Sequence, residues 1–296
     1  MKLLLIGGNG QVGTELRRAL LPLGEVVVTT RDGIALDGQA TLSCDLSKKD
    51  AVALVIQHVI PDVVINATAY TAVDKAESDE DTARRINAAA VEEITLACKG
   101  LGIPLVHYST DYVFDGKATT PYPVDAPSAP LGVYGQTKLD GEEAIRASGV
   151  RHLILRTAWV YATHGHNFLR TMLRLGAERD SLRVVGDQIG SPTPAWLIAD
   201  ITANILAQGL GEGGTHHLVA SGQTSWHGFA EAIFEEAAAN DLIANAPKVE
   251  SIPSSEYPTP AARPQWSVLD TTSLRDTYHL NLPDWRDALK RTLQSA

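Results

Sequence analysis

The sequence predicts an α/β fold with a doubly wound parallel sheet and a smaller C-terminal α/β lobe. Two observations support this prediction. Short apolar runs alternate with amphipathic stretches through the first half of the 296 residues, which is the pattern of parallel strands joined by crossover helices. A glycine series also follows the first apolar run directly, where the first amphipathic stretch begins.

The first half alternates strand and helix patterns. We expect strands at residues 3–6, 26–28, 63–65, 105–108 and 151–156, and helices at 11–21, 47–59 and 83–97. Pro22 and Gly24 should end the first helix. Ser47 and Asp50 resemble a capping box, which places the start of the second helix at Ser47.

The pattern becomes less regular after residue 160. Helices are expected at 168–175, 195–206 and 229–239, with short strands between them. We therefore predict a first domain over residues 1–160 and a second lobe over residues 161–296, with some segments of the lobe returning to the first sheet. The proline-rich segment 258–264 is predicted to be a loop over a site.

Composition excludes several classes of protein. The formal net charge is −10 and no basic stripe interrupts it, which argues against a nucleic-acid partner. Cys44 and Cys98 lie far apart and in no metal-ligand spacing, so a reducing compartment fits best. The N-terminal apolar run is too short for a signal peptide or a membrane span. We expect a cytoplasmic protein without a membrane partner.

Three glycines form a phosphate-binding pattern. Gly7, Gly10 and Gly13 lie between the first strand and the first helix. Such glycines let the backbone approach a pyrophosphate, whose charge meets the free N–H groups of Gln11 and Val12 at the helix start. The series predicts a dinucleotide site and hence a Rossmann-type sheet, although a plain glycine turn would read the same.

The end of the second strand bears on the choice of cofactor. Arg31 stands where an acidic residue commonly binds the adenosine 2′-hydroxyl. A guanidinium can bind a 2′-phosphate instead, so NADPH is the favoured cofactor. Asp32 and Asp37 lie near enough to leave NADH open, and a solvated loop arginine is the alternative for Arg31.

Two later strand ends should reach the same crevice, because the carboxyl ends of parallel strands share one edge of the sheet. Small or polar residues occur at both ends: Asp45, Leu46, Ala67, Thr68 and Ala69. They are predicted to line the adenine and nicotinamide-ribose sites, unless they are simple strand-to-loop transitions.

Tyr134 and Lys138 are spaced i, i+4, which places both side chains on one face of a helix. The spacing alone is common. The spacing is stronger evidence here for two reasons. The glycine series lies upstream, and a strand ends at Ser109-Thr110, between the glycine series and Tyr134.

Ketone reduction explains the pair, because it needs a hydride at carbon and a proton at oxygen. Tyr134 would donate the proton, and Lys138 would lower the pKa of its phenol and bind the nicotinamide ribose. An ammonium about 4 Å away at an effective dielectric near 20 is worth about 4 kcal/mol, enough for roughly three pKa units. Thr110 would hydrogen-bond the carbonyl oxygen.

Longer motifs match a known family. They cover residues 7–13, 66–77, 109–116, 134–138, 156–161 and 187–193. In these segments the chain resembles the extended short-chain dehydrogenase/reductases, and within them the dTDP-4-dehydrorhamnose reductase family. The resemblance implies NADPH-dependent reduction of the C4 ketone of dTDP-4-dehydro-L-rhamnose to dTDP-L-rhamnose, for cell-surface polysaccharides. The first domain would then bind the dinucleotide and the second lobe mainly the sugar nucleotide.

The resemblance also implies roles for single residues. Thr110, Tyr134 and Lys138 would be the catalytic triad, and Asp111, Tyr112 and Trp159 would lie near the sugar. Arg263 resembles a residue that reaches the nucleotide diphosphate, although Trp266 replaces an expected asparagine nearby. Core packing is the alternative for Trp159.

A family feature that this chain departs from is a magnesium site at a dimer interface. Glu15 matches the first of its glutamates, but Trp196 and Gln294 lie where the others would fall. We therefore predict no metal, while a homodimer stays open.

Other functions stay open as well. A dehydratase of the same superfamily would need Thr-Asp-Glu, and this chain has Thr110-Asp111-Tyr112. Another sugar-nucleotide reductase, an epimerase, or a non-catalytic subunit resembling the regulatory subunit of methionine adenosyltransferase remain alternatives.

Overall fold

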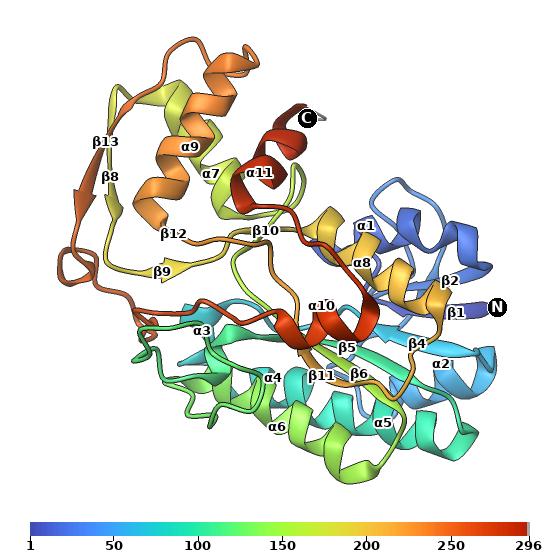
Figure 1. Ribbon diagram of the computed structural model, residues 1–296. Coiled ribbons are helices and arrows are strands. Elements are labelled where there is room, and N and C mark those ends of the chain that lie inside the picture. Colours follow the sequence, from blue (N-terminus) through green and yellow to red (C-terminus); the bar gives the residue numbers. More distant parts are fainter. Residues whose placement is uncertain (295–296) are drawn as a thin grey trace.

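A seven-stranded sheet forms the centre of the computed structural model, which describes residues 1–294 (Figure 1). Its strand order is β11-β6-β5-β4-β1-β2-β3, and every neighbouring pair is parallel. The strands are β1 (Lys2–Ile6), β2 (Glu25–Thr30), β3 (Leu42–Ser43), β4 (Val63–Asn66), β5 (Leu105–Thr110), β6 (His152–Thr157) and β11 (Gly214–His217).

The order of the strands creates a crevice at one edge of the sheet. The chain runs from β1 outward through β2 and β3, and then returns to the other side of β1 at β4. The loops that follow β1 and β4 therefore leave in opposite directions, and the space between them is where parallel α/β sheets bind ligands.

Helices cover both faces, because alternate residues of each strand are buried on opposite sides. Leu3 and Leu5 face α1 (Gln11–Ala19) and α8 (Ala195–Gln208). Leu4 and Ile6 face α2 (Ala51–Val59), α5 (Ala90–Leu101) and α6 (Val133–Ser148). The predicted fold class is confirmed.

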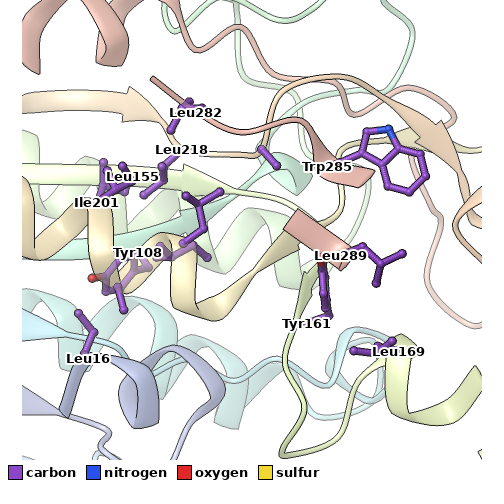
Figure 2. Close-up of a cluster of buried hydrophobic side chains, with 14 of the residues drawn as sticks. Leu16, Tyr108, Leu155, Tyr161, Leu169, Ile201, Leu218, Leu282, Trp285 and Leu289 are labelled. Carbon is purple, nitrogen blue, oxygen red and sulfur yellow. The ribbon is translucent and has the colours of Figure 1, made fainter. Parts of the chain in front are cut away.

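The core on the α8 face continues into the second lobe. Figure 2 shows Leu155 and Ile201 in one cluster with Tyr161, Trp285 and Leu289. Elements outside the main sheet are α3 (Val73–Ala76), α4 (Glu80–Arg84), α7 (Phe168–Glu178), α9 (Trp226–Ala239), α10 (Thr272–Tyr278), α11 (Trp285–Gln294), β7 (Val160–Tyr161), β8 (Ser181–Val185), β9 (Ile189–Gly190), β10 (Thr193–Pro194), β12 (Thr224–Ser225) and β13 (Lys248–Ile252).

Segments beyond residue 160 contribute to both parts of the molecule. β11 pairs with β6 in the main sheet, and α8 packs on α1. The helices α7 and α9 and the parallel pair β8–β13 lie together, away from α5 and α6 (Figure 1). The division into two domains at residue 160 stays a prediction.

Two helix boundaries differ from those expected. The capping box at Ser47 is wrong, because the Ser47 hydroxyl donates to Asp45 Oδ1 (2.8 Å) in a turn and α2 begins only at Ala51. The helix expected at 83–97 is instead α4, a π-helical turn over Arg85–Ala89, and α5. A local side-chain hydrogen bond sets the start of α2, and a π-helical turn interrupts the helix expected at 83–97. Neither feature produces a periodic pattern in the sequence.

No helix within residues 1–294 is both long enough and apolar enough to cross a membrane.

Candidate active site

A cavity of about 720 Å³ opens at the crevice between β1 and β4. Its volume lies within the range of small-molecule and cofactor sites. The cavity joins residues that the sequence analysis selected from five separate segments: Gly7, Gly10, Gln11, Val12, Arg31, Asp45, Leu46, Ala67, Thr68, Ala69, Tyr134 and Lys138.

Two glycines of the loop leave no room for a side chain. Gly7 has φ +91°, and a Cβ there would lie 2.5 Å from Thr68 Cγ2. A Cβ on Gly13 would lie 2.0 Å from the Gly7 carbonyl oxygen, so Gly13 lets α1 pack against the loop and does not line the cavity. The first N–H groups of α1 have no partner within the helix, and Gly10, Gln11 and Val12 line the cavity at that end. These residues fit a pyrophosphate.

The acidic residues near Arg31 are engaged in local contacts. Asp32 also lines the cavity, and its carboxylate accepts hydrogen bonds from the Ile34 N–H and the Thr30 hydroxyl (both 3.2 Å), with the Ile34 bond the largest cause of its lowered pKa. Asp37 pairs with Arg17 at 2.6 Å. Asp37 is not among the residues that line the cavity.

Tyr134 and Lys138 lie on one face of α6, as expected from their spacing. Thr110 ends β5 and is 5% exposed. Burial raises the pKa of Tyr134 to about 12; a hydrogen bond with Thr110 opposes this shift, and the charge of Asp111 adds to it. The expected lowering of the Tyr134 pKa by Lys138 is therefore not found in this structure, because loss of solvent around the phenol outweighs the other effects.

Lys138 is only 1% exposed and is held from β5. Its Nζ donates to the Tyr108 carbonyl oxygen (2.7 Å) and lies 3.2 Å from His107 Nε2. Burial lowers the pKa of Lys138 to about 8, and the charge of Glu142, one turn further along α6, opposes this shift. Sequence reasoning missed His107, since its role depends on a neighbour 31 residues away.

Three of the four residues expected to bind substrate lie near one another: Asp111, Tyr112 and Arg263. The ring of Tyr112 meets that of Tyr134 edge to face, with centroids 5.4 Å apart. Burial is the main cause that raises the pKa of Tyr112; Asp111 adds to it and Arg263 opposes it. Asp111 accepts a hydrogen bond from Thr110 (3.0 Å), and burial raises its pKa to about 6.

Arg263 is brought to this group by the loop over residues 258–264. Its guanidinium donates to Asp74 Oδ2 at 2.7 Å, and the N–H of Ala261 donates to Asp74 Oδ1 at 3.2 Å. Asp74 belongs to α3, which follows β4. The segment is therefore a loop, as expected, and it is tied to α3, but its residues are not among those that line the cavity.

Trp159 takes a different position. It has φ +48° and stacks on Trp226 of α9, with ring centroids 3.5 Å apart and planes 5° apart. A Cβ on Gly190 would lie 2.5 Å from the Trp159 ring. Trp159 therefore joins the segment after β6 to the second lobe.

A further wall of the cavity was not anticipated. Gly165 and His166 line it, and the loop that carries them is anchored by Asn167, whose side chain donates to Gln11 Oε1 at 2.7 Å. No spacing or composition signal marks this loop, because the contact joins residues 156 positions apart.

Glu15, Trp196 and Gln294, considered above for a metal, do line one cavity of about 470 Å³. Glu15 lies 3.0 Å from His164 Nε2. Within residues 1–294, no three His, Cys, Asp or Glu side chains gather in a way that could hold a metal ion.

The crevice brings a glycine loop that fits a pyrophosphate into one cavity with the Tyr134 phenol and the Lys138 amine. That combination, on a parallel sheet of this order, defines the extended short-chain dehydrogenase/reductases, a class of NAD(P)H-dependent oxidoreductases.

Comparison with known proteins narrows the class. The family model described as RmlD substrate binding domain matches residues 1–296. dTDP-4-dehydrorhamnose reductases from Shigella flexneri and Escherichia coli are both 46% identical to the chain, over 99% of it and 97% of each relative. The chain therefore belongs to the dTDP-4-dehydrorhamnose reductase family.

Solved structures agree with this assignment. A dTDP-4-dehydrorhamnose reductase from Clostridium acetobutylicum has a TM-score of 0.90 at 35% identity, covering 100% of this chain and 99% of that one. The enzyme from Bacillus anthracis, solved in complex with NADP, has a TM-score of 0.89 at 32% identity, with coverage of 100% and 99%.

Proposed function

We propose that this protein reduces the C4 ketone of dTDP-4-dehydro-L-rhamnose to dTDP-L-rhamnose, with NADPH as the reductant. The observation that carries the proposal is that Tyr134 and Lys138 line the same cavity as the glycine loop. The choice of sugar rests on the names of the relatives. The residues of the crevice support a dinucleotide and a proton donor, but they do not distinguish one hexose from another.

The contacts around Arg31 support NADPH. Of the nearby carboxylates, Asp32 is held by Ile34 and Thr30, and Asp37 by Arg17. Arg31 lines the cavity and is exposed, so its guanidinium is available to a 2′-phosphate. The relative solved with NADP is consistent with this choice. NADH binding would instead use Asp32.

Tyr134 is the proton donor in this proposal. Bound NADPH supplies a hydride to the carbonyl carbon, and the Tyr134 hydroxyl gives its proton to the carbonyl oxygen. Thr110 hydrogen-bonds the same oxygen. The phenolate left on Tyr134 is stabilised by the ammonium form of Lys138 and, once the substrate oxygen carries its proton, by the Thr110 hydroxyl, and it is then reprotonated from solvent.

The second lobe and the 258–264 loop would hold the sugar nucleotide. Tyr112 offers an aromatic ring for the apolar patches of a deoxy-sugar, and Asp111 offers a buried polar group beside Thr110. Trp159 stacks on Trp226, so it would shape this region from the second lobe. Arg263 would reach the diphosphate. Its guanidinium would leave Asp74 and pair with the negative charge of the ligand instead.

The test is loss of NADPH absorbance on addition of dTDP-4-dehydro-L-rhamnose to the purified protein. We expect turnover that falls by about 10²–10⁴ in kcat for Tyr134→Phe, the usual contribution of a positioned acid. The matched control is Tyr257→Phe, since Tyr257 is 61% exposed. Cofactor binding without turnover would overturn the proposal and favour a non-catalytic binding role.

A further inference from the structure

Beneath the active-site lysine lies a buried chain of hydrogen bonds. It runs from Thr68 through Asn66 on β4 to His107 on β5 and ends at Lys138 on α6. Asn66 and His107 are fully buried and Lys138 is 1% exposed, so bulk water cannot replace any of these partners. Each link must therefore pair a donor with an acceptor.

The direction of each hydrogen bond in this series is set at its Thr68 end. The Thr68 N–H can only donate, and it lies 3.1 Å from Asn66 Oδ1. The Thr68 hydroxyl donates to the same oxygen. The amide nitrogen of Asn66 therefore points the other way, toward His107 Nδ1 at 3.1 Å. An amide nitrogen is only a donor, so His107 Nδ1 must accept and carries no proton.

The absence of a proton on His107 Nδ1 determines the state of the other ring nitrogen, Nε2. Burial lowers the pKa of His107 well below its ordinary value, so the ring is neutral. A neutral imidazole with a bare Nδ1 carries its proton on Nε2. That N–H points at Lys138 Nζ, 3.2 Å away. Only an uncharged amine has a lone pair to accept it, and the amine still donates to the Tyr108 carbonyl oxygen at 2.7 Å.

We propose that His107, oriented by Asn66, is a positioning residue that acts through Lys138 by favouring its neutral amine over the ammonium. The ammonium form requires the chain to invert: the His107 proton moves from Nε2 to Nδ1, and Asn66 turns its oxygen toward the ring, away from Thr68. This inference rests on the proposed function for its catalytic consequence, but its structural part stands without it.

The other groups around Lys138 do not reverse this conclusion. On α6, Glu142 favours the ammonium, but Arg156 of β6 pairs with it at 2.7 Å. The neighbouring phenols, Tyr134 on α6 and Tyr108 on β5, both have raised pKa values through burial and are neutral. The Cys44 thiol, which also lines the cavity, is neutral because burial raises its pKa to about 11. Burial lowers the pKa of Lys138 to about 8, so the amine is the main form only above that pH.

The sharpest variant is Asn66→Asp, which keeps the shape of the side chain and replaces the donor by an acceptor. One carboxylate oxygen still accepts from Thr68, and the other faces His107 Nδ1. The ring must then carry its proton on Nδ1, and the bare Nε2 accepts from the ammonium of Lys138. We expect the alkaline fall of kcat/KM, centred near pH 8 in the unmodified enzyme, to move up by about one pH unit or more in the variant.

Asn204→Asp is the matched control, since Asn204 is exposed on α8 and the same charge is added. It should leave the pH profile in place. A fall in kcat for Asn66→Asp without movement of the alkaline midpoint would mean that the chain has only a structural role, and would overturn the inference.

A direct measurement does not depend on turnover or on the variant folding. The ¹⁵N chemical shifts of His107 in the unmodified protein above pH 8 report which ring nitrogen is protonated, and His107→Gln identifies the signals. We expect a bare Nδ1 and a protonated Nε2. A protonated Nδ1 would overturn the inference, whereas an inactive protein with the expected tautomer would count against the proposed reaction alone.

Discussion

Burial shifts the two ionisable groups of the Tyr134–Lys138 pair in opposite directions. It raises the pKa of the tyrosine to about 12 and lowers that of the lysine to about 8. Loss of water penalises whichever form is charged, which is the phenolate for tyrosine and the ammonium for lysine. The pair is therefore poised between neutral and charged states of Lys138 close to physiological pH.

The cofactor preference is a prediction at the level of one residue. Arg31→Ala should raise the KM for NADPH by roughly tenfold, because a charge-assisted contact with a phosphate is worth about 1.5–3 kcal/mol when buried and less where exposed. The KM for NADH should change little. Steady-state kinetics with both cofactors measure the ratio.

Arg179→Ala is the control for Arg31, since Arg179 is exposed after α7 and lies outside the residues lining the cavity. An unchanged ratio of the two KM values in Arg31→Ala would show that Arg31 does not bind the 2′-phosphate.

At the scale of elements, α6 is the main support of the site. It carries Tyr134 and Lys138 toward the cavity, and Glu142 on the same helix binds Arg156 of β6 through two hydrogen bonds of 2.9 and 2.7 Å. The π-helical turn before α5 adds a second support, since its Asn87 donates to Thr137 on α6 at 3.1 Å. The i, i+4 spacing predicts the shared face, but these anchors come from distant segments.

The junction of β1 and α1 provides a test of close backbone packing. Gly13→Ala should destabilise the protein by about 1–3 kcal/mol, the usual cost of forcing extra atoms into a packed site, because the added Cβ would lie 2.0 Å from a carbonyl oxygen. Thermal or denaturant unfolding measures the change, and NADPH affinity should fall with it.

Gly100→Ala is a matched substitution within α5, where nothing lies within 4 Å of the new Cβ. It should be neutral or stabilising by up to about 1 kcal/mol, the difference in helix propensity. Equal effects of the two substitutions would contradict the packing argument at Gly13.

At the scale of the whole molecule, the cavity is closed by segments that are remote in sequence. The loop containing Gly165 and His166 closes one side through the Asn167–Gln11 bond. The 258–264 loop is tied to α3 through Arg263 and Asp74, although its residues are not among those that line the cavity. A ligand in the crevice would therefore bridge the main sheet and the second lobe.

Cofactor binding should accordingly stabilise the entire fold. NADPH at about 100 times its Kd should add about 2.7 kcal/mol to the free energy of unfolding, as mass action requires for a ligand that binds only the folded state. Differential scanning calorimetry should show a single transition that moves to higher temperature. Movement of only part of the transition would mean that the second lobe unfolds independently of the cofactor site.

The sequence by itself determined the class of fold, the glycine loop and the candidate triad, because apolar periodicity, glycine spacing and the i, i+4 rule act over a few residues. Only the tertiary structure decided that His107 and Asn66 lie under Lys138, that Asn167 closes the cavity on Gln11, and that Arg263 pairs with Asp74. These partners are separated by 31 to 189 positions. Contact between these residues depends on strand order and on the packing of loops. The protonation state of the site follows from those contacts.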